Sequence, residues 1–187
     1  INLKQHSLLR CGQCIRHPPS FDRSFAAFSY DPPIPKLIHE IKNRARLDTI
    51  ELATELFVER FETQVGDLPP EVIMPVPLHP RRLYQRGYNQ AGEWARSLGR
   101  SLRIPCDDSS CRRILNTPQQ QGLSAKARHH NLKDCFHLEP AFAATRVAIV
   151  DDVMTTGTTA EVLAKKLKKQ GVKHVEVWCL ARTPNRK

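Results

Sequence analysis

Short apolar segments alternate with helical segments from Glu71 to the end of the chain. The sequence runs through EVIMPVP, a predicted helix over 89–102, SSCRRIL, RVAIVDD, a predicted helix over 159–170, and KHVEVWCLA. Strands that are almost wholly apolar and separated by helices are typical of a parallel sheet covered on both faces. The pattern therefore predicts an α/β fold with a twisted, mainly parallel sheet flanked by helices.

The prolines at 69–70 separate this region from a different one before it. There the sequence predicts a strand over 24–31, a helix from Pro35 to Arg44, and a second helix capped by Asp48. Apolar residues at helical spacing predict a buried stripe on that second helix, made of Leu52, Leu56, Phe57 and Phe61. We therefore predict three parts, 1–22, 23–70 and 71–187.

The net charge of +10, from 29 Lys and Arg against 19 Asp and Glu, suits phosphate-bearing partners such as nucleotides, phosphosugars or nucleic acid. A solvated basic face explains the same charges, including the run AKKLKKQGVK at 164–173. No apolar stretch reaches the length of a membrane span and no signal peptide is visible. The 6 cysteines are scattered, with a single C-x-x-C at Cys11 and Cys14. We therefore expect a cytoplasmic protein in a reducing compartment.

Two adjacent acids, Asp151 and Asp152, follow an apolar segment in VAIVDDVMTTGTT at 147–159. Ligands of open α/β sheets bind just beyond such strand ends, and buried acids without a partner are costly. The carboxylates can accept hydrogen bonds from the vicinal hydroxyls of a ribose. The threonine-rich turn can hold a phosphate at the start of the next helix. The residues predict a site for a ribose 5-phosphate unit; the alternative is an acidic turn with threonine caps.

Three arginines, Arg81, Arg82 and Arg86, follow another predicted strand in VIMPVPLHPRRLYQRGYNQA at 72–91. Guanidinium groups bind phosphate oxygens in pairs, and a diphosphate leaving group needs such neutralisation. Without a ligand, the same arginines are solvated residues of a surface helix. Both interpretations stay open for each of them.

A long polar segment, TPQQQGLSAKARHHNLKDC, lies between Asn116 and Phe136. Loops of this length inside a compact domain are usually functional or mobile. Closure of such a loop would exclude water from a reaction that breaks a bond to an anomeric carbon. Its cations could supply positive charge to the departing diphosphate; they are Lys126, Arg128, His129 and His130. For the two histidines we favour exposed loop positions without such a role.

VAIVDDVMTTGTT resembles the phosphoribosyl-pyrophosphate (PRPP) binding motif of type I phosphoribosyltransferases, and 72–91 resembles their pyrophosphate loop. The resemblance implies that Asp151 and Asp152 are catalytic and contact the ribose hydroxyls, and that Mg²⁺ accompanies PRPP. The implied PRPP-binding residues are Val150, Asp151, Asp152, Met154, Thr155, Thr156, Gly157, Thr158 and Thr159, with Leu78, His79, Arg81, Arg82 and Arg86.

The polar segment resembles the mobile catalytic loop of the same enzymes. Its motif residues correspond here to Thr117, Gln120, Leu123, Ser124, Arg128, Asn131 and Phe136. The resemblance makes Arg128 a third catalytic residue. Because no covalent intermediate is implied, the mechanism would be electrostatic.

With the tail VEVWCLART, these segments resemble the ComF family of competence-associated, phosphoribosyltransferase-like proteins, including its GntX-type members, over nearly the whole chain. The resemblance implies a phosphoribosyltransferase core at 71–187, a small N-terminal hood region at 23–70 that builds the acceptor pocket, and a partial zinc module at 1–22. Structural zinc needs four ligands, and Cys11 and Cys14 supply two. His17 could add a third, so we expect zinc only if further ligands precede residue 1.

Two functions of different class follow from these features. The first is Mg²⁺-dependent transfer of a phosphoribosyl group from PRPP to an unidentified acceptor, linked to competence, DNA uptake or DNA utilisation. The second is a non-catalytic PRPP- or nucleotide-binding protein that binds single-stranded DNA in transformation, alongside competence proteins. Intact acids and an intact threonine loop argue against a third, a degenerate scaffold. Basic and aromatic residues do not interleave regularly, so no base-stacking platform is predicted.

Overall fold

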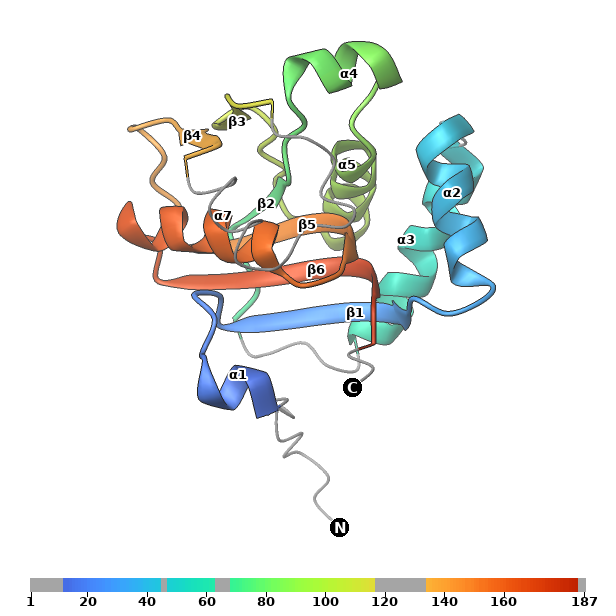
Figure 1. Cartoon of the computed structure of the whole chain (residues 1–187), viewed down its shortest axis with the longest axis horizontal. Coiled ribbons are helices and arrows are strands. Elements are labelled where there is room, and N and C mark those ends of the chain that lie inside the picture. Colours follow the sequence, from blue (N-terminus) through green and yellow to red (C-terminus); the bar gives the residue numbers. More distant parts are fainter. Residues whose placement is uncertain (1–11, 45–46, 63–67, 117–133, 185–187) are drawn as a thin grey trace.

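The computed structural model describes residues 12–44, 47–62, 68–116 and 134–184 (Figure 1). Its helices are α1 (Gly12–Arg16), α2 (Ile34–Arg44), α3 (Leu47–Glu62), α4 (Pro80–Arg86), α5 (Gln90–Leu102) and α7 (Thr158–Lys169). Its strands are β1 (Arg23–Ser29), β2 (Val72–Pro75), β3 (Cys111–Arg113), β4 (Phe136–Leu138), β5 (Arg146–Met154) and β6 (His174–Arg182).

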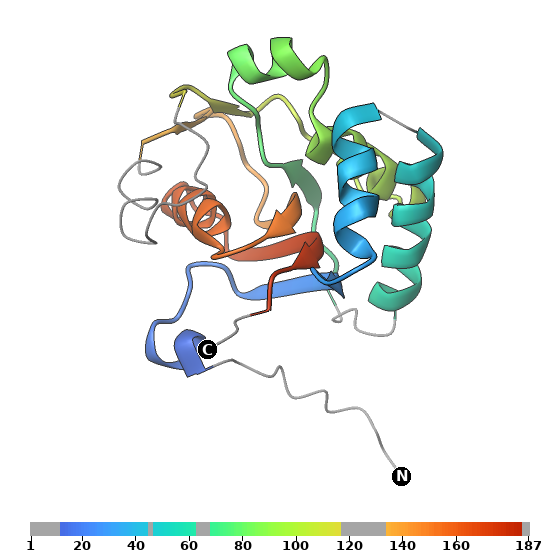
Figure 2. The same ribbon diagram turned by 45° about the vertical axis from the view of Figure 1, so that its right-hand side comes forward.

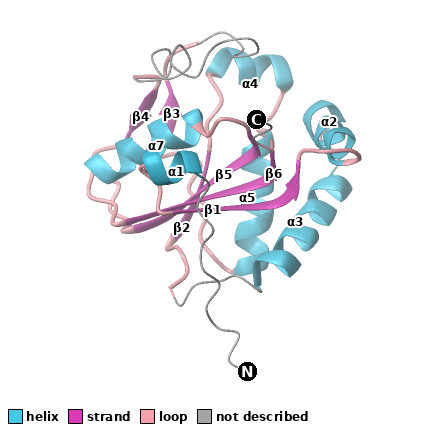
Figure 3. Cartoon of the chain, turned by 60° about the horizontal axis from the view of Figure 1, so that its bottom comes forward, coloured by secondary structure: helices cyan, strands magenta, loops and turns pink. Residues whose placement is uncertain are grey.

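Four parallel strands form the main sheet, in the order β1-β6-β5-β2. The two inner strands are apolar because helices cover both of their faces, as Figure 3 shows for α7 on one side and α3 and α5 on the other. The predicted α/β fold with a mainly parallel, helix-flanked sheet is confirmed. Among the described residues, no helix is both long and apolar enough to cross a bilayer.

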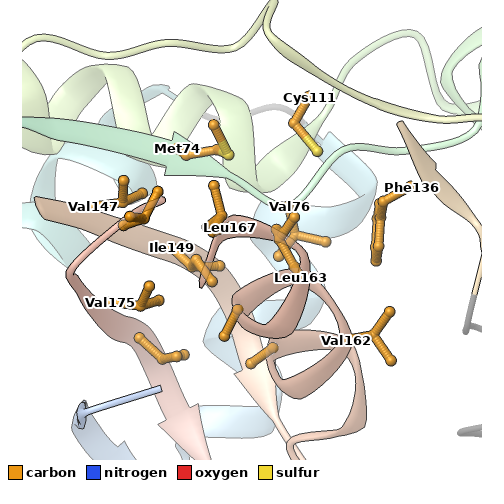
Figure 4. Close-up of a cluster of buried hydrophobic side chains, with 14 of the residues drawn as sticks. Met74, Val76, Cys111, Phe136, Val147, Ile149, Val162, Leu163, Leu167 and Val175 are labelled. Atoms are coloured by element: carbon orange, nitrogen blue, oxygen red, sulfur yellow. The ribbon is translucent and has the colours of Figure 1, made fainter. Parts of the chain in front are cut away.

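One face of the sheet packs against α7 and the β3-β4 pair. Alternate residues of β5 and β6, such as Val147, Ile149 and Val175, point to this side, where they meet Leu163 and Leu167 of α7 (Figure 4). All five side chains are buried. Because the apolar residues of α7 recur at helical spacing, the helix is fixed along the sheet with its first turn near the end of β5.

The other face packs against α3 and α5, with α2 beside α3 (Figure 2). Phe57 of α3 lies at its centre, with its ring centroid 5.2 Å from that of Trp94 and 5.8 Å from that of Trp178. Edge-to-face and tilted contacts of this kind add to the gain from burying the rings. This aromatic cluster packs α3 onto the sheet. The pairing of β1 with β6 attaches the same part of the chain, before residue 70, to the sheet a second time.

Two details predicted for α3 are wrong. Asp48 lies inside the first turn and does not precede the helix, although its charge still favours the positive helix end. Leu52 is 48% exposed, whereas Ile50 and Ala53 are buried. The stripe that faces the core follows positions 50, 53, 57 and 61, and residue 52 falls outside that spacing.

Three short elements, β3, β4 and α1, differ from the sequence prediction. The segment at 109–115 supplies β3, which pairs antiparallel with β4 in a separate two-stranded sheet, whereas the sequence predicts a strand of the parallel sheet. Neither β4 nor the helical turn α1 is predicted, because elements of three to five residues carry too little periodicity. The three-part division at 22 and 70 stays a prediction.

Candidate ligand site at the strand ends

The acid pair lies inside β5, which continues to Met154. The sequence places these acids at the strand's end, and this boundary is wrong by two residues because Val153 and Met154 still pair with β6. The backbone N–H of Asp152 donates to Asp151 Oδ1 at 2.9 Å, and that of Val153 donates to Asp152 Oδ1 at 2.7 Å. Both carboxylates are half-buried, and these local bonds restrict their orientation.

A neutral thiol lies beside the acid pair. Cys179 is directly opposite Asp151 in the β5-β6 register, and its Sγ donates to the carbonyl of Phe25 at 3.5 Å. Burial raises the pKa of Cys179 to about 12, and the charge of Asp151 adds to this effect. Since the thiol stays protonated, it adds no negative charge to that of the carboxylates at neutral pH.

The threonine-rich turn leads from β5 into α7. Thr155 and Thr156 are exposed, and the hydroxyls of Thr156 and Thr158 lie 2.8 Å apart. The N–H of Glu161 donates to the carbonyl of Gly157 at 2.8 Å and so closes the first turn of α7. The N–H groups before it, together with the helix dipole, form the kind of helix start that binds anions.

Gly157 precedes this helix in a conformation that few other residues adopt. Its φ is +74°, and no side-chain hydrogen bond caps the helix that it begins. A Cβ at this position would lie 2.7 Å from Cε of Met154. The close approach of the loop backbone to Met154 therefore depends on glycine.

The arginine segment begins at the neighbouring strand end. Pro75 of β2 lies opposite Val150 in the register, and Val76 N–H donates to the carbonyl of Val150 at 2.8 Å. The side chain of Asn89 donates to the carbonyl of Val76 at 3.1 Å and so fixes the return of the chain towards α5. The segments that follow β5 and β2, which are the threonine turn and the arginine helix α4, consequently leave the sheet at the same carboxyl edge (Figure 1).

Helix α4 directs its arginines to different sides. It starts after His79, whose Nδ1 accepts from the N–H of Arg81, and it ends at Gly87 with φ +78°. Arg81 is exposed, whereas Arg82 is half-buried. Burial lowers the pKa of Arg82, and the charges of Arg113 and then Arg86 lower it further. The Arg82 guanidinium is therefore within electrostatic range of two other cations. Leu78, also half-buried, lies in the turn before the helix.

Arg113 of β3 is a site candidate that the sequence reasoning missed. It is 9% exposed, whereas its neighbour Arg112 points outward, and its guanidinium carbon lies 5.8 Å from the ring centroid of Phe136. Alternation in CRR was the available signal, because successive residues of a strand face opposite sides. Arg113 and Arg82 together place positive charge beside the β3-β4 pair.

Several predicted residues lie outside the described part of the chain. They are Cys11, Thr117, Gln120, Leu123, Ser124, Lys126, Arg128, His129, His130 and Asn131. Phe136 is buried in the core, and Cys14 is a half-buried residue of α1. Within the ranges that the structure describes, no three His, Cys, Asp or Glu side chains gather as a metal site.

The carboxyl half of the chain, residues 85–187, matches the model of the phosphoribosyl transferase domain. The chain is 37% identical over 181 residues to the DNA utilization protein YhgH of Escherichia coli K12, covering 95% of this chain and 80% of that protein. It is 39% identical over 184 residues to Competence protein F of Haemophilus influenzae Rd, with the same coverage. The chain belongs to the ComF family of phosphoribosyltransferase-like proteins. This ComF-family chain thus has relatives named for competence and DNA utilisation along nearly its whole length.

Two solved structures also resemble the ComF-family chain. The purine phosphoribosyltransferase from Pyrococcus horikoshii Ot3 is 22% identical, with a TM-score of 0.41 and coverage of 72% of this chain and 73% of that one. An adenine phosphoribosyltransferase is 15% identical, with a TM-score of 0.42 and coverage of 76% and 72%. The family assignment rests on the sequence matches alone.

The need for glycine at 157 can be tested by stability measurements. We expect Gly157→Ala to lower the free energy of unfolding by about 1–2 kcal/mol, because it strains a positive φ and displaces the end of Met154. Gly92→Ala, inside α5, is the matched control; its Cβ meets Asn89 at an ordinary 3.4 Å, so it should be neutral or stabilising by up to about 1 kcal/mol. Equal effects of the two substitutions in urea denaturation would contradict this account.

Proposed function

We propose that this ComF-family protein binds PRPP with Mg²⁺ at the carboxyl edge of its sheet and transfers the phosphoribosyl group to an acceptor. The observation that supports this most is the continuous path from Asp151 and Asp152 in β5, through the threonine turn, into the first turn of α7. One strand end thus offers carboxylates for hydroxyls and a helix start for a phosphate. A ribose 5-phosphate carries both groups on one ring.

The acid pair would bind the ribose. Carboxylates accept short, charge-assisted hydrogen bonds from hydroxyls, and vicinal hydroxyls can engage two of them. Asp151 and Asp152 are already oriented by neighbouring backbone N–H groups, so little ordering is needed when the sugar binds. Their negative charge also favours the positive character that develops at the anomeric carbon as the leaving group departs.

The threonine turn would bind the 5-phosphate. The hydroxyls of Thr156 and Thr158, which lie 2.8 Å apart, can donate to the same group, and the first N–H groups of α7 add further donors. Gly157 keeps the backbone close enough for those N–H groups to reach the ligand. The buried contacts of α7 with the sheet hold this helix start in place.

The arginines would bind the diphosphate, which leaves as the acceptor nitrogen bonds to the anomeric carbon. Arg82 is turned inward towards Arg113, whereas Arg81 is exposed, so Arg82 is the better placed of the two. The guanidinium groups of Arg82, Arg86 and Arg113 repel one another, and a bound anion would reduce that repulsion. Arg128 stays a prediction for the same role, and its position is outside the described residues.

Magnesium would accompany the diphosphate. The oxygen donors of Asp151 and Asp152 fit this cation, which prefers carboxylates, phosphates and water. Held there, Mg²⁺ would supply positive charge to the diphosphate oxygens as their bond to the anomeric carbon breaks. Zinc stays a prediction for the N-terminal region, since Cys14 is described but Cys11 is not.

The PRPP site can be tested by calorimetry on a variant that keeps the shape of the acid pair. Asp151→Asn with Asp152→Asn retains the Oδ1 acceptors of the local hydrogen bonds but removes both charges. We expect the affinity for Mg²⁺-PRPP to fall about a hundredfold, since each charged hydrogen bond is worth about 1.5–3 kcal/mol.

The adjacent acids Asp107 and Asp108 supply a matched control. Asp107→Asn with Asp108→Asn removes the same charge at a turn whose acids are not proposed to contact the ligand, and it should leave PRPP binding unchanged. A folded wild-type protein that gives no heat with PRPP, or equal losses in both double variants, would refute the proposal. Pyrophosphate release across a panel of bases would then separate transfer from binding alone.

Single-stranded DNA is a second candidate ligand, supported by the outer face of α4. Arg81, Tyr84 and Gln85 share one helix face because they are three and four positions apart. With Pro80 they form an open surface on the helix, and Tyr84 is 91% exposed. An exposed ring beside a guanidinium suits a base and its phosphate. The names of the relatives, DNA utilization protein and Competence protein F, agree with such a ligand and with competence proteins as partners.

The DNA candidate can be tested with a fluorescent oligothymidine. We expect Tyr84→Ala to weaken binding about tenfold, since stacking of one base is worth about 1–3 kcal/mol. Leu83→Ala, at the neighbouring exposed apolar residue, should change the affinity little. The affinity should also fall steeply with salt. Absence of binding at low salt, or an unchanged affinity in Tyr84→Ala, would exclude this face.

A further inference from the structure

Residues 18–22, which we term the N-terminal strap, connect α1 to β1 and contact α7 on the way. The backbone N–H of Ser20 donates to one carboxylate oxygen of Glu161 at 2.7 Å, and its hydroxyl donates to the other oxygen at 2.7 Å. At the far end of the helix, Asp22 accepts from Lys168 Nζ at 2.6 Å. The strap therefore holds the first and the last turn of the helix that begins at the threonine turn.

The strap is itself fixed to the sheet. The N–H of Asp22 donates to the carbonyl of Val175 at 2.8 Å, and its carboxylate accepts from the N–H of Val175 at 2.7 Å. Burial acts to raise the pKa of Asp22, but the bonds from Lys168 and Val175 outweigh it and lower that pKa overall. Phe21 packs against the core beneath α7. Ser20 consequently presents its two donors from a rigid support.

Glu161 is an acid in the first turn of α7, three positions after Thr158. With a rise of about 1.5 Å per residue, its backbone lies about 4.5 Å along the axis from the residue where the helix begins. A carboxylate this near the helix start benefits from the helix dipole, but it repels any phosphate bound at the same end. The direction in which Glu161 points therefore affects an anionic ligand.

We propose that Ser20 and Glu161 are positioning residues of the PRPP site. By accepting both donors of Ser20, the carboxylate of Glu161 is held on the strap and away from the 5-phosphate at the start of α7. This inference rests on the proposed function. Its consequence is that the segment before β1, far from the acid pair in sequence, sets the affinity of the threonine turn for phosphate.

A Ser20–Glu161 contact that only stabilises the fold would behave differently from one that positions the charge of Glu161. If the Ser20–Glu161 contact only stabilises the fold, Ser20→Ala and Glu161→Gln each weaken that contact. Their effects on PRPP binding then have the same sign. If the contact directs a charge, Ser20→Ala weakens binding, whereas Glu161→Gln removes the charge and cannot. Glutamine keeps one oxygen that accepts from Ser20, so one of the two hydrogen bonds remains in Glu161→Gln, just as Ser20→Ala keeps the bond from the backbone N–H.

The experiment measures dissociation constants for Mg²⁺-PRPP, ribose 5-phosphate and pyrophosphate by calorimetry on the full chain, with melting temperatures as a check of folding. We expect Ser20→Ala to weaken PRPP and ribose 5-phosphate by about threefold to tenfold and to leave pyrophosphate unchanged. Glu161→Gln should bind at least as tightly as the wild type, and the double variant should match Glu161→Gln. Ser109→Ala, in the turn before β3, and Glu93→Gln, in the first turn of α5, are matched controls because neither of these described residues is hydrogen-bonded to Ser20 or Glu161.

Each outcome decides the matter. Loss in Ser20→Ala with recovery in the double variant supports the positioning role. The positioning role is overturned if the wild type binds PRPP and Ser20→Ala binds it equally well. It is also overturned if Ser20→Ala weakens binding and the double variant with Glu161→Gln does not restore it. A wild type that binds neither PRPP nor ribose 5-phosphate refutes the proposed function itself, and this inference with it.

Discussion

The parallel pairing of β5 with β2 and β6 is the constraint on which the rest of the molecule depends. Since parallel strands end at one edge, the register that sets Pro75 opposite Val150 brings the segments after both strands to the same place. One of these segments carries the acid pair and the threonine turn, and the other carries the arginine helix α4. The candidate site follows from this pairing more than from any direct contact between its side chains.

Charge is divided between the two segments. The carboxylates lie inside β5, next to a thiol that burial keeps protonated, and the inward-facing guanidinium of Arg82 lies with that of Arg113. Opposite charges placed on neighbouring strand ends suit a ligand with hydroxyls at one side and phosphates at the other. The strap adds a further control, because it directs the one acid in the first turn of α7.

Much of this arrangement could be predicted from the sequence. Long, strongly apolar segments such as the one around Ile149 identify buried parallel strands, and the order of acids, threonines and glycine predicts the candidate site. The strand boundary was missed by two residues because Val153 and Met154 belong equally well to a strand or a turn. Arg113 is not predicted because alternation over three residues is a weak signal, which becomes convincing only once the burial of Arg113 shows which way it points.

The strap could not be predicted at all, since the contact of Ser20 with Glu161 joins residues 141 positions apart and leaves no local pattern. Spacing along the chain carries no information on such a contact. It depends on β1 taking its place beside β6, which only the folded sheet defines.

In the proposed function, the start of α7 holds a phosphate whose sugar is bound by the acid pair. The most direct measurement is the change in backbone amide NMR shifts as ribose 5-phosphate is added. We expect the largest shifts to fall on residues 151–160 and to saturate together. Shifts confined to α4 or to the basic face of α7, or none at saturating ligand, would contradict the proposed function.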